Sequence, residues 1–313
     1  MKFSVLIANY NNSRYLATAL DSVLAQSYTN WEIVLVDDAS TDDFFTVVEP
    51  YLQDPRIHLF HNDFNHGCGF TKKRCVDLAD GEILGFLDPD DQLDSEALKV
   101  MIMAHQQNRN CGIIHSTHFV CDENLVVKRV AEYVRALPEN TPYLLLNDGR
   151  IHHFATFRKS NYLQTPGIEA TNLRAVDQDL YYKLEETGSV MYLEQPLYYY
   201  RIHPGGISTT GKESETAIVH YAIVRDRCRI RIAALKKQSP SYNRQMIKRY
   251  RTRYFKISAF YWSRKGNWFY CLSHLLVYPF VGGASNLIGY MKKFPQQGFG
   301  LLKKSFVSNY EIK

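Results

Sequence analysis

Cysteine is scarce in this 313-residue sequence, and no C-x-x-C pair occurs among the six cysteines. That pattern suits buried thiols in a reducing compartment better than disulfides or a zinc site. A long apolar run is also missing from the amino end, because Asn9 interrupts the first one before it reaches the length of a signal peptide. We therefore expect a cytoplasmic protein. Hydrophobic residues at 45% and charged residues at 22% are ordinary for a folded chain, which argues against disorder.

Acidic residues are scarce in the last third of the chain. From residue 212 onward there are 20 Lys and Arg but only 4 Asp and Glu, a surplus of 16 positive charges. Because the whole chain carries +5, residues 1–211 carry −11. The acidic part should need cations or a metal-chelated substrate, and the basic part favours phosphate groups or an anionic membrane surface, with solvated helix faces as the alternative. Nucleic acid is not an expected partner, because the acidic part would repel it and no nucleic-acid motif is present.

Residues 266–291 contain no Asp, Glu, Lys or Arg. That length could cross a bilayer, which needs about 20 apolar residues. His274, Pro279 and Gly282 favour something shallower, namely a segment lying in the membrane interface. A soluble helical extension and a transmembrane hairpin are the alternatives.

Short β-rich runs alternate with helical stretches over the first 120 residues, which predicts an α/β fold with a mostly parallel sheet flanked by helices. The expected strands are 3–8, 31–37, 57–61 and 83–87. The helices expected between them are 16–27, 43–52 and 71–79. Polar stretches follow three of these strands, at 9–12, 37–42 and 88–91. Ligands bind outside the carboxyl ends of strands in such sheets, so the three stretches should share one crevice.

The remaining elements are less regular. We expect helices at 96–108 and 177–186, a hairpin turn at 122–124, and strands at 111–119, 190–193 and 197–202. Beyond residue 211 the composition becomes basic, aromatic and compatible with helices. No internal repeat or low-complexity tract is present.

Three carboxylates crowd the end of the apolar run GEILGFLDPDD, at Asp88, Asp90 and Asp91. Such acids raise one another's pKa unless a cation neutralises them. Mn²⁺ or Mg²⁺ would do so, since hard divalent ions prefer oxygen ligands and keep room for substrate phosphates. A turn followed by acids at a helix start is the alternative, and for Asp91 in particular the alternative is that it begins the next helix.

Four segments resemble, in this order, the motifs of the family 2 inverting glycosyltransferases of GT-A fold that build bacterial polysaccharides. They cover residues 3–208 and read SVLIANYNNSRYLATALDSVLAQSYTNWEIVLVDDASTDD, NHGCGFTKKRCVDLADGEILGFLDPDD, VDQDLYYKL and PLYYYRIHPGGIS.

The resemblance implies a GT-A catalytic domain at 1–211, with a Rossmann-like sheet. Its halves would be 1–119, for the nucleotide-sugar, and 120–211, for the acceptor and the catalytic base. Residues 212–313 would then be a helical, membrane-associating extension, and the protein would be peripheral on the inner face of the cell membrane. The implied reaction moves a sugar from a nucleoside diphosphate, with UDP favoured, to a glycan or lipid-linked acceptor.

The nucleotide contacts come from two places in the family. The loop after the first strand and the second acid of the V-D-D-x-S stretch hold the base and ribose. The resemblance gives these roles to Ala8, Asn9, Tyr10 and Asp38. For Asp38, an Asx-turn or a helix cap is the alternative.

Lys72 departs from the family pattern. The usual Asn-x-Gly-x-x-x-Ala-Arg-Asn stretch reads NHGCGFTKKR here, so Lys72 replaces the arginine that approaches the nucleotide. The positive charge is kept but the bidentate fork is not, because an ammonium is a point charge. Arg74 is the alternative contact.

The D-x-D motif of the family corresponds to Asp88 and Asp90. Asp90 is implied to bind Mn²⁺ or Mg²⁺ directly, and Asp88 to hold the ribose or a metal-bound water. His203 is implied to join the metal or the diphosphate. Arg201 and residues 205–208 have the composition of a mobile lid over phosphates.

Asp177 matches the family's general base, which opens a helix. Val176 stands where a supporting glutamate is common, and Asp179 is the more structural of the two acids. Both acids could instead be simple N-terminal helix charges. His152 and His153 are expected on the acceptor side, with core packing as the alternative.

Two other functions compete with glycosyl transfer. A sugar-nucleotide pyrophosphorylase also pairs acids with a metal, but its glycine-rich, basic loop near the amino end is missing here. A non-catalytic module that binds glycans or nucleotide-sugars is the second alternative.

Overall fold

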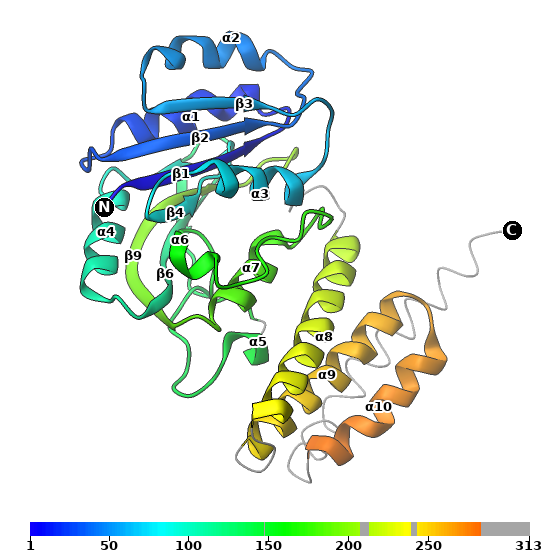
Figure 1. The fold of residues 1–313 in the computed structure, drawn as a ribbon. Helices are drawn as coiled ribbons and strands as arrows, with labels where there is room; N and C mark the ends of the chain where they lie inside the picture. Colours follow the sequence, from blue (N-terminus) through cyan, green and yellow to red (C-terminus); the bar gives the residue numbers. More distant parts are fainter. Residues whose placement is uncertain (147, 207–212, 239–242, 283–313) are drawn as a thin grey trace, which may run out of the picture. The chain divides into compact units, whose positions relative to one another are not determined.

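The computed structural model describes residues 1–146, 148–206, 213–238 and 243–282 (Figure 1). The chain divides into two compact units, Met1–Gly211 and Lys212–Lys313. All six cysteines are free thiols, and five of them are buried.

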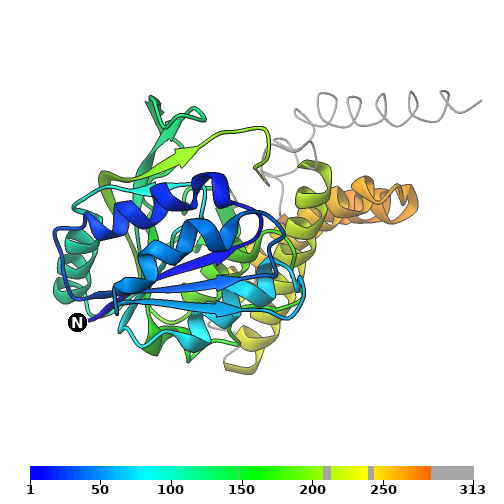
Figure 2. The ribbon, with the colours of Figure 1, turned by 90° about the horizontal axis from the view of Figure 1, so that it is seen from above.

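Four parallel strands form the first half of the sheet in unit 1, in the order β3-β2-β1-β4. They are β1 (Phe3–Asn9), β2 (Trp31–Asp37), β3 (Ile57–His61) and β4 (Ile83–Phe86). The helices that connect them are α1 (Ser13–Leu24), α2 (Phe44–Val48) with the short η1 (Glu49–Gln53), and α3 (Cys68–Leu78). α1 and α3 lie on opposite faces of these strands (Figure 2). The expected strands and crossover helices are therefore present.

β1 and β2 are buried along almost their whole length, as strands covered on both faces must be. Phe3, Val5 and Ile7 alternate along one face of β1 and pack in the main core with Leu16 and Leu20 of α1. Because the strands run parallel with Asn9 opposite Asp37, their polar carboxyl ends meet at one edge.

The second half of the sheet is mixed, in the order β8-β6-β9-β5. Its strands are β5 (Gln92–Leu93), β6 (Cys111–Cys121), β8 (Ala155–Arg158) and β9 (Ser189–Arg201), with β7 (Val127–Val130) forming the expected hairpin with β6. β8 runs antiparallel to both β4 and β6, whereas β9 is parallel to β6. The helices of this half are α4 (Ala97–Gln107), α5 (Tyr143–Leu146), α6 (Lys159–Tyr162) and α7 (Val176–Leu184).

β9 is one long strand, where two strands were expected. The pairing with β6 shifts between Ser116, opposite Leu193, and Thr117, opposite Pro196, so an irregularity accommodates the proline without ending the strand. The far end of β9 pairs antiparallel with β5. This pairing brings the residues after β9 to the acids that follow β4.

Unit 2 is helical, with α8 (Glu213–Gln238) packed on α9 (Arg244–Arg264) and α9 on α10 (Trp268–Gly282). Ile247, Tyr250 and Ile257 form the buried side of α9, and Arg231 of α8 donates a hydrogen bond to the Tyr250 hydroxyl at 2.8 Å.

Membrane crossing was one interpretation of residues 266–291. Within the described residues, no helix combines the length and the apolar character that crossing a bilayer requires. α10 covers the first part of this stretch, and 283–291 lie outside the described residues.

Candidate active site

Asp91 is buried at the carboxyl end of β4, and the alternative in which it begins the next helix is wrong, because α4 begins only at Ala97. Its carboxylate accepts hydrogen bonds from the Tyr198 hydroxyl and from the Arg201 backbone N–H, both at 2.7 Å. Burial, with two further acids nearby, raises the pKa of Asp91 well above its usual value. Asp91 therefore joins the turn after β4 to β9.

Asp90 lies beside His203, with 2.9 Å between its Oδ2 and the histidine Nε2. Burial and the neighbouring Asp88 raise the pKa of the Asp90 carboxyl. Arg201 Nε donates to the Asp90 carbonyl at 2.5 Å, and its guanidinium lies 4.4 Å from the centre of the Tyr15 ring. The structure thus brings together the two residues that were expected to hold a metal.

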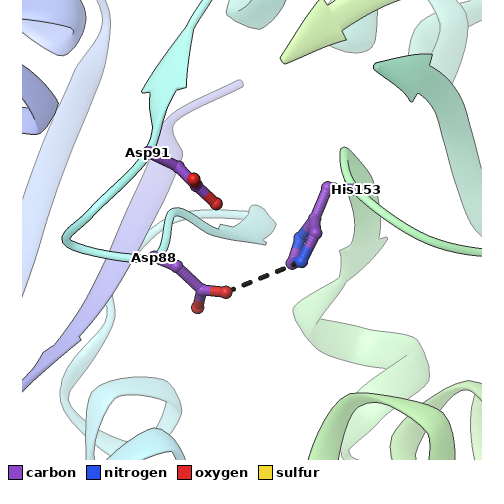
Figure 3. Close-up of side chains that lie close together, drawn as sticks. All are labelled: Asp88, Asp91 and His153. Carbon is purple, nitrogen blue, oxygen red and sulfur yellow. Dashed lines mark ion pairs between the residues drawn. The ribbon is translucent and has the colours of Figure 1, made fainter. Parts of the chain in front are cut away.

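Asp88 lies between two basic side chains. Its Oδ1 is 3.2 Å from Lys72 Nζ. Its Oδ2 is 3.6 Å from His153 Nε2 (Figure 3). Burial lowers the pKa of His153 to about 3, so the ring is neutral near pH 7. The backbone N–H of Asp88 donates to the Tyr198 hydroxyl at 3.1 Å. Of its two basic neighbours, Lys72 is therefore the charged partner of Asp88.

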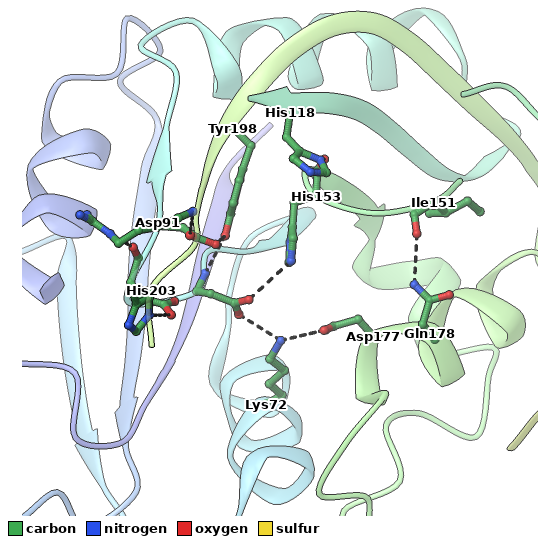
Figure 4. A network of polar contacts seen from close by, with 12 residues as sticks. Lys72, Asp91, His118, Ile151, His153, Asp177, Gln178, Tyr198 and His203 are labelled. Carbon is green, nitrogen blue, oxygen red and sulfur yellow. Dashed lines mark hydrogen bonds and ion pairs between the residues drawn. The ribbon is translucent and has the colours of Figure 1, made fainter. Parts of the chain in front are cut away.

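Lys72 joins Asp88 to Asp177, which lies far away in the sequence (Figure 4). Its Nζ is 2.9 and 3.1 Å from the two carboxylate oxygens of Asp177. The side chain is buried, and the ammonium lies 4.9 Å from the centre of the Phe86 ring. Burial alone would lower the pKa of Lys72, but Asp177 and Asp88 outweigh it and raise the pKa well above its usual value.

Asp177 lies in the first turn of α7, after Ala175, which has a positive φ of 54°. The next residue, Gln178, fixes this turn by donating to the Ile151 carbonyl at 3.1 Å and accepting from the Tyr143 hydroxyl at 2.5 Å. Because its neighbour is anchored, the expected base has a defined position next to Lys72.

Asp179 lies away from these contacts. It forms a buried ion pair with Lys183 at 2.6 Å, one helical turn along α7. The lysine also donates to the Gly167 carbonyl. This arrangement fits a structural role.

The expected nucleotide contacts lie at the carboxyl ends of β1 and β2. Tyr10 is 44% exposed, whereas Asn9 is buried and donates to Asp37 Oδ1 at 2.9 Å. Ala8 precedes Asn9 and is partly buried. Among the described residues, nothing donates a hydrogen bond to the buried Asn9 Oδ1.

Asp38 is buried and fixes the loop before α3. Its carboxylate accepts from Asn62 Nδ2 at 2.6 Å and from the backbone N–H groups of His66 and Gly67 at 2.9 and 2.8 Å. Gly67 has a φ of +88°, which glycine adopts without strain. Asp38, which was expected to contact the nucleotide, therefore holds the loop that precedes α3 and Lys72.

Arg74 is directed at the end of β3, where it donates to the His61 carbonyl at 2.6 Å and to Asn62. Arg74 and Lys72 thus contact different groups. The structure connects Lys72, and not Arg74, to Asp88 and Asp177.

The part played by Tyr198 and by the ring cluster behind His153 was not expected from the sequence. The His153 ring stacks on Tyr198 at 4.8 Å. His118 Nδ1 donates to the His153 carbonyl at 3.1 Å, and the Tyr133 hydroxyl lies 3.1 Å from His118 Nε2. The run Tyr198-Tyr199-Tyr200 was the available signal, but the contacts that give Tyr198 its role are long-range.

The donor set fits a divalent cation. Asp88, Asp91 and His153 offer ligand atoms within 4.8 Å of one another, although both carboxylate oxygens of Asp91 already accept hydrogen bonds. Asp90 and His203 form a second acid–histidine pair, 2.9 Å apart, and Asp88 belongs to the same turn as Asp90. Carboxylate oxygen with imidazole nitrogen suits Mn²⁺, and carboxylate alone suits Mg²⁺.

A family model described as glycosyl transferase family 2 matches residues 4–164. An uncharacterised glycosyltransferase of Nostoc sp., alr2836, is 29% identical over 212 residues, 65% of each chain. EpsE of Bacillus subtilis, also named as a glycosyltransferase, is 30% identical over 208 residues, 63% of this chain and 72% of EpsE. Chondroitin synthase of Escherichia coli is 27% identical over 251 residues, 79% of this chain but 35% of the synthase. The chain thus spans less than two thirds of the Nostoc relative and of the synthase.

Two solved structures of S. aureus TarS, residues 1–349, share the fold. One has a TM-score of 0.68 at 20% identity and covers 100% of this chain and 93% of TarS. The other, a complex with UDP-GlcNAc, has a TM-score of 0.62 at 16% identity and covers 95% and 92%. The likeness confirms the expected α/β fold of the GT-A type. Since the family model matches half of the chain and EpsE supports it independently, this chain belongs to glycosyltransferase family 2.

Proposed function

We propose that this protein transfers a sugar from a UDP-sugar to a glycan or lipid-linked acceptor in surface polysaccharide synthesis, with inversion at the anomeric carbon. The observation that carries the proposal is the convergence of Asp88, Asp90 and His203 with Lys72 and Asp177. Chondroitin synthase among the relatives, and the TarS complex with UDP-GlcNAc, support this substrate class.

The nucleotide would lie across the carboxyl ends of β1 and β2. Asn9 Oδ1 offers a buried acceptor for a donor group of the base or ribose, and Tyr10 offers an exposed ring beside it. Asp38 would act largely through the loop that it holds. Arg201 Nη2, buried without an acceptor among the described residues, is a donor available to a phosphate oxygen.

Asp90 and His203 would hold Mn²⁺ or Mg²⁺, with Asp88 beside them. When bound, such an ion neutralises the charge that develops on the departing diphosphate. Asp177 would take the proton of the acceptor hydroxyl while that oxygen attacks the anomeric carbon from the face opposite the nucleotide. The bond from that carbon to the diphosphate oxygen breaks with its electron pair, and UDP leaves.

The test begins with a thermal-shift panel of UDP-sugars, with Mn²⁺ and then with a chelator. The substrate should raise the melting temperature only when the metal is present. Transfer of that sugar should then fall at least about 100-fold in Asp177→Asn, while donor binding stays within a few-fold. Asp77→Asn, an exposed acid on α3, is the control and should keep full activity. Unchanged turnover in Asp177→Asn would remove Asp177 from the role of base, and release of pyrophosphate instead of UDP would favour a pyrophosphorylase.

We propose that unit 2 binds to the anionic inner face of the cell membrane. Phe269, Leu276 and Phe280 of α10 are 78%, 70% and 84% exposed, and α9 carries exposed basic side chains. Apolar rings and cations together suit the interface of an anionic bilayer.

Vesicle sedimentation tests this surface. The protein should sediment with phosphatidylglycerol vesicles and much less with phosphatidylcholine vesicles. The double variant Phe269→Glu and Phe280→Glu should bind at least about tenfold more weakly. Equal binding to both vesicle types, or no loss in the variant, would contradict membrane association through α10.

A further inference from the structure

Resting on the proposed function, we propose that Lys72 is the resident counter-ion of the active site. Its ammonium competes with a divalent cation for Asp88, so that the metal binds tightly only when a nucleoside diphosphate offers Lys72 other oxygens. The observation behind this proposal is that Lys72 bridges Asp88 and Asp177.

The hydrogen-bonding capacity of Lys72 is fully used. An ammonium has three N–H donors and no acceptor. Its three observed contacts go to one oxygen of Asp88 and both oxygens of Asp177. To contact a diphosphate, Lys72 must therefore release at least one carboxylate oxygen.

Burial makes this exchange consequential. The Lys72 side chain is 6% exposed, and those of Asp88 and Asp177 are 29% and 28% exposed. Because the ammonium is almost completely removed from water, it interacts strongly with these carboxylates, and removal of one of them would leave its charge less well compensated. The two carboxylates thus hold Lys72 in place until another anion replaces a carboxylate beside Lys72, or another cation replaces Lys72 beside a carboxylate.

Asp88 is the group for which the two cations compete. Its other basic neighbour, His153, lies farther away, with Nε2 3.6 Å from Oδ2, whereas Lys72 Nζ lies 3.2 Å from Oδ1. A doubly charged ion at Asp90 and His203 would lie beside Asp88 and repel the ammonium. A diphosphate removes this conflict, because it binds the metal and also supplies acceptors to Lys72.

The lysine itself suits such an exchange. A compact ammonium on a flexible stem can change partners by rotating its side-chain bonds, whereas an arginine fork is fixed in a plane. α3 anchors the stem, and Phe86 offers its ring face 4.9 Å from the charge. Having Lys72 in place of the family's arginine therefore allows this exchange of partners in the present chain.

The test measures binding of Mn²⁺ by electron paramagnetic resonance, with and without UDP. Without UDP, Lys72→Met should bind Mn²⁺ at least tenfold more tightly than the wild type. UDP should increase the Mn²⁺ affinity of the wild type at least tenfold, and this gain should shrink in the variant. Lys73→Met, which removes an exposed lysine of the same helix, should behave as the wild type, and Lys72→Arg should keep weak binding of Mn²⁺ alone.

Lys72→Ala is measured as a second neutral variant, and circular dichroism establishes that each variant is folded. The inference is overturned if both neutral variants bind Mn²⁺ alone no more tightly than the wild type. If the Mn²⁺ affinity of the wild type nevertheless rises with UDP, that result does not contradict the proposed function. If the wild type binds no Mn²⁺ even with UDP, the proposed metal dependence fails together with the inference.

Discussion

His105 gives a prediction about acid stability that can be calculated from its surroundings. The residue lies in α4 and is fully buried, with Nε2 3.0 Å from Thr156 Oγ1. Since the Thr156 hydroxyl donates to the Ile114 carbonyl, Nε2 must carry the hydrogen and donate to Thr156. Among the described residues, Nδ1 is buried without a partner, so protonation would place a charge where nothing accepts it.

Burial, with Arg158 nearby, lowers the pKa of His105 to about 3, against about 6.5 in an unfolded chain. The folded state therefore binds fewer protons than the unfolded state between these values. The stability that the neutral ring contributes is present above pH 6.5 and is lost as the pH falls toward 3. Linkage gives a loss of about 2 kcal/mol at pH 5, and about 5 kcal/mol below pH 3.

The perturbation is His105→Gln, because glutamine can keep an N–H donor near Thr156 and does not titrate. Urea unfolding of the wild type and the variant at pH 7.5 and pH 5 measures the effect. The wild type should lose about 2 kcal/mol more than the variant between these two values. Gln106→Ala, an exposed neighbour on α4, should follow the wild type. Equal losses in His105→Gln and the wild type would refute the reasoning.

Two further predictions concern stability. Asp179→Asn breaks the buried pair with Lys183 and should lower the free energy of unfolding by about 3–5 kcal/mol, measured by urea unfolding. A loss below about 1 kcal/mol would show that the pair is solvated. Gly69→Ala would place a Cβ 2.4 Å from the Asn172 carbonyl and 2.7 Å from that of Glu169. It should therefore lower the melting temperature by several degrees, and an unchanged value would show that this loop moves freely.

The first half of the fold was predictable because its signals are local. Each of β1 to β4 is a short apolar run between polar residues, and the rule for open α/β sheets places the ends of β1, β2 and β4 at one edge. Asp90 and Asp177 could be proposed as site residues for the same reason, because each belongs to a short motif. Their positions relative to Lys72 could be seen only in the folded chain.

The second half depends on contacts between distant residues. Asp91 and Tyr198 are separated by 107 positions, and no local pattern indicates that they share a hydrogen bond. The same holds for β9, whose irregular pairing with β6 lets one strand continue past Pro196. The start of a helix was the alternative role for Asp91 because acids are favoured there, and tertiary pairing overrode that preference.

Each acid after β4 has a different partner, which explains how the chain tolerates so much negative charge in one turn. Asp91 is satisfied by neutral donors, Asp90 by His203 and Asp88 by Lys72. A carboxylate with a hydrogen-bond donor or a cation beside it does not destabilise the fold in the way that an unpaired one does. Burial and the neighbouring acids nevertheless raise the pKa of Asp90 and of Asp91, so the turn still disfavours their charged forms. In the proposed reaction, a requirement for metal would arise with the diphosphate, whose charge exceeds what the single ammonium of Lys72 can balance.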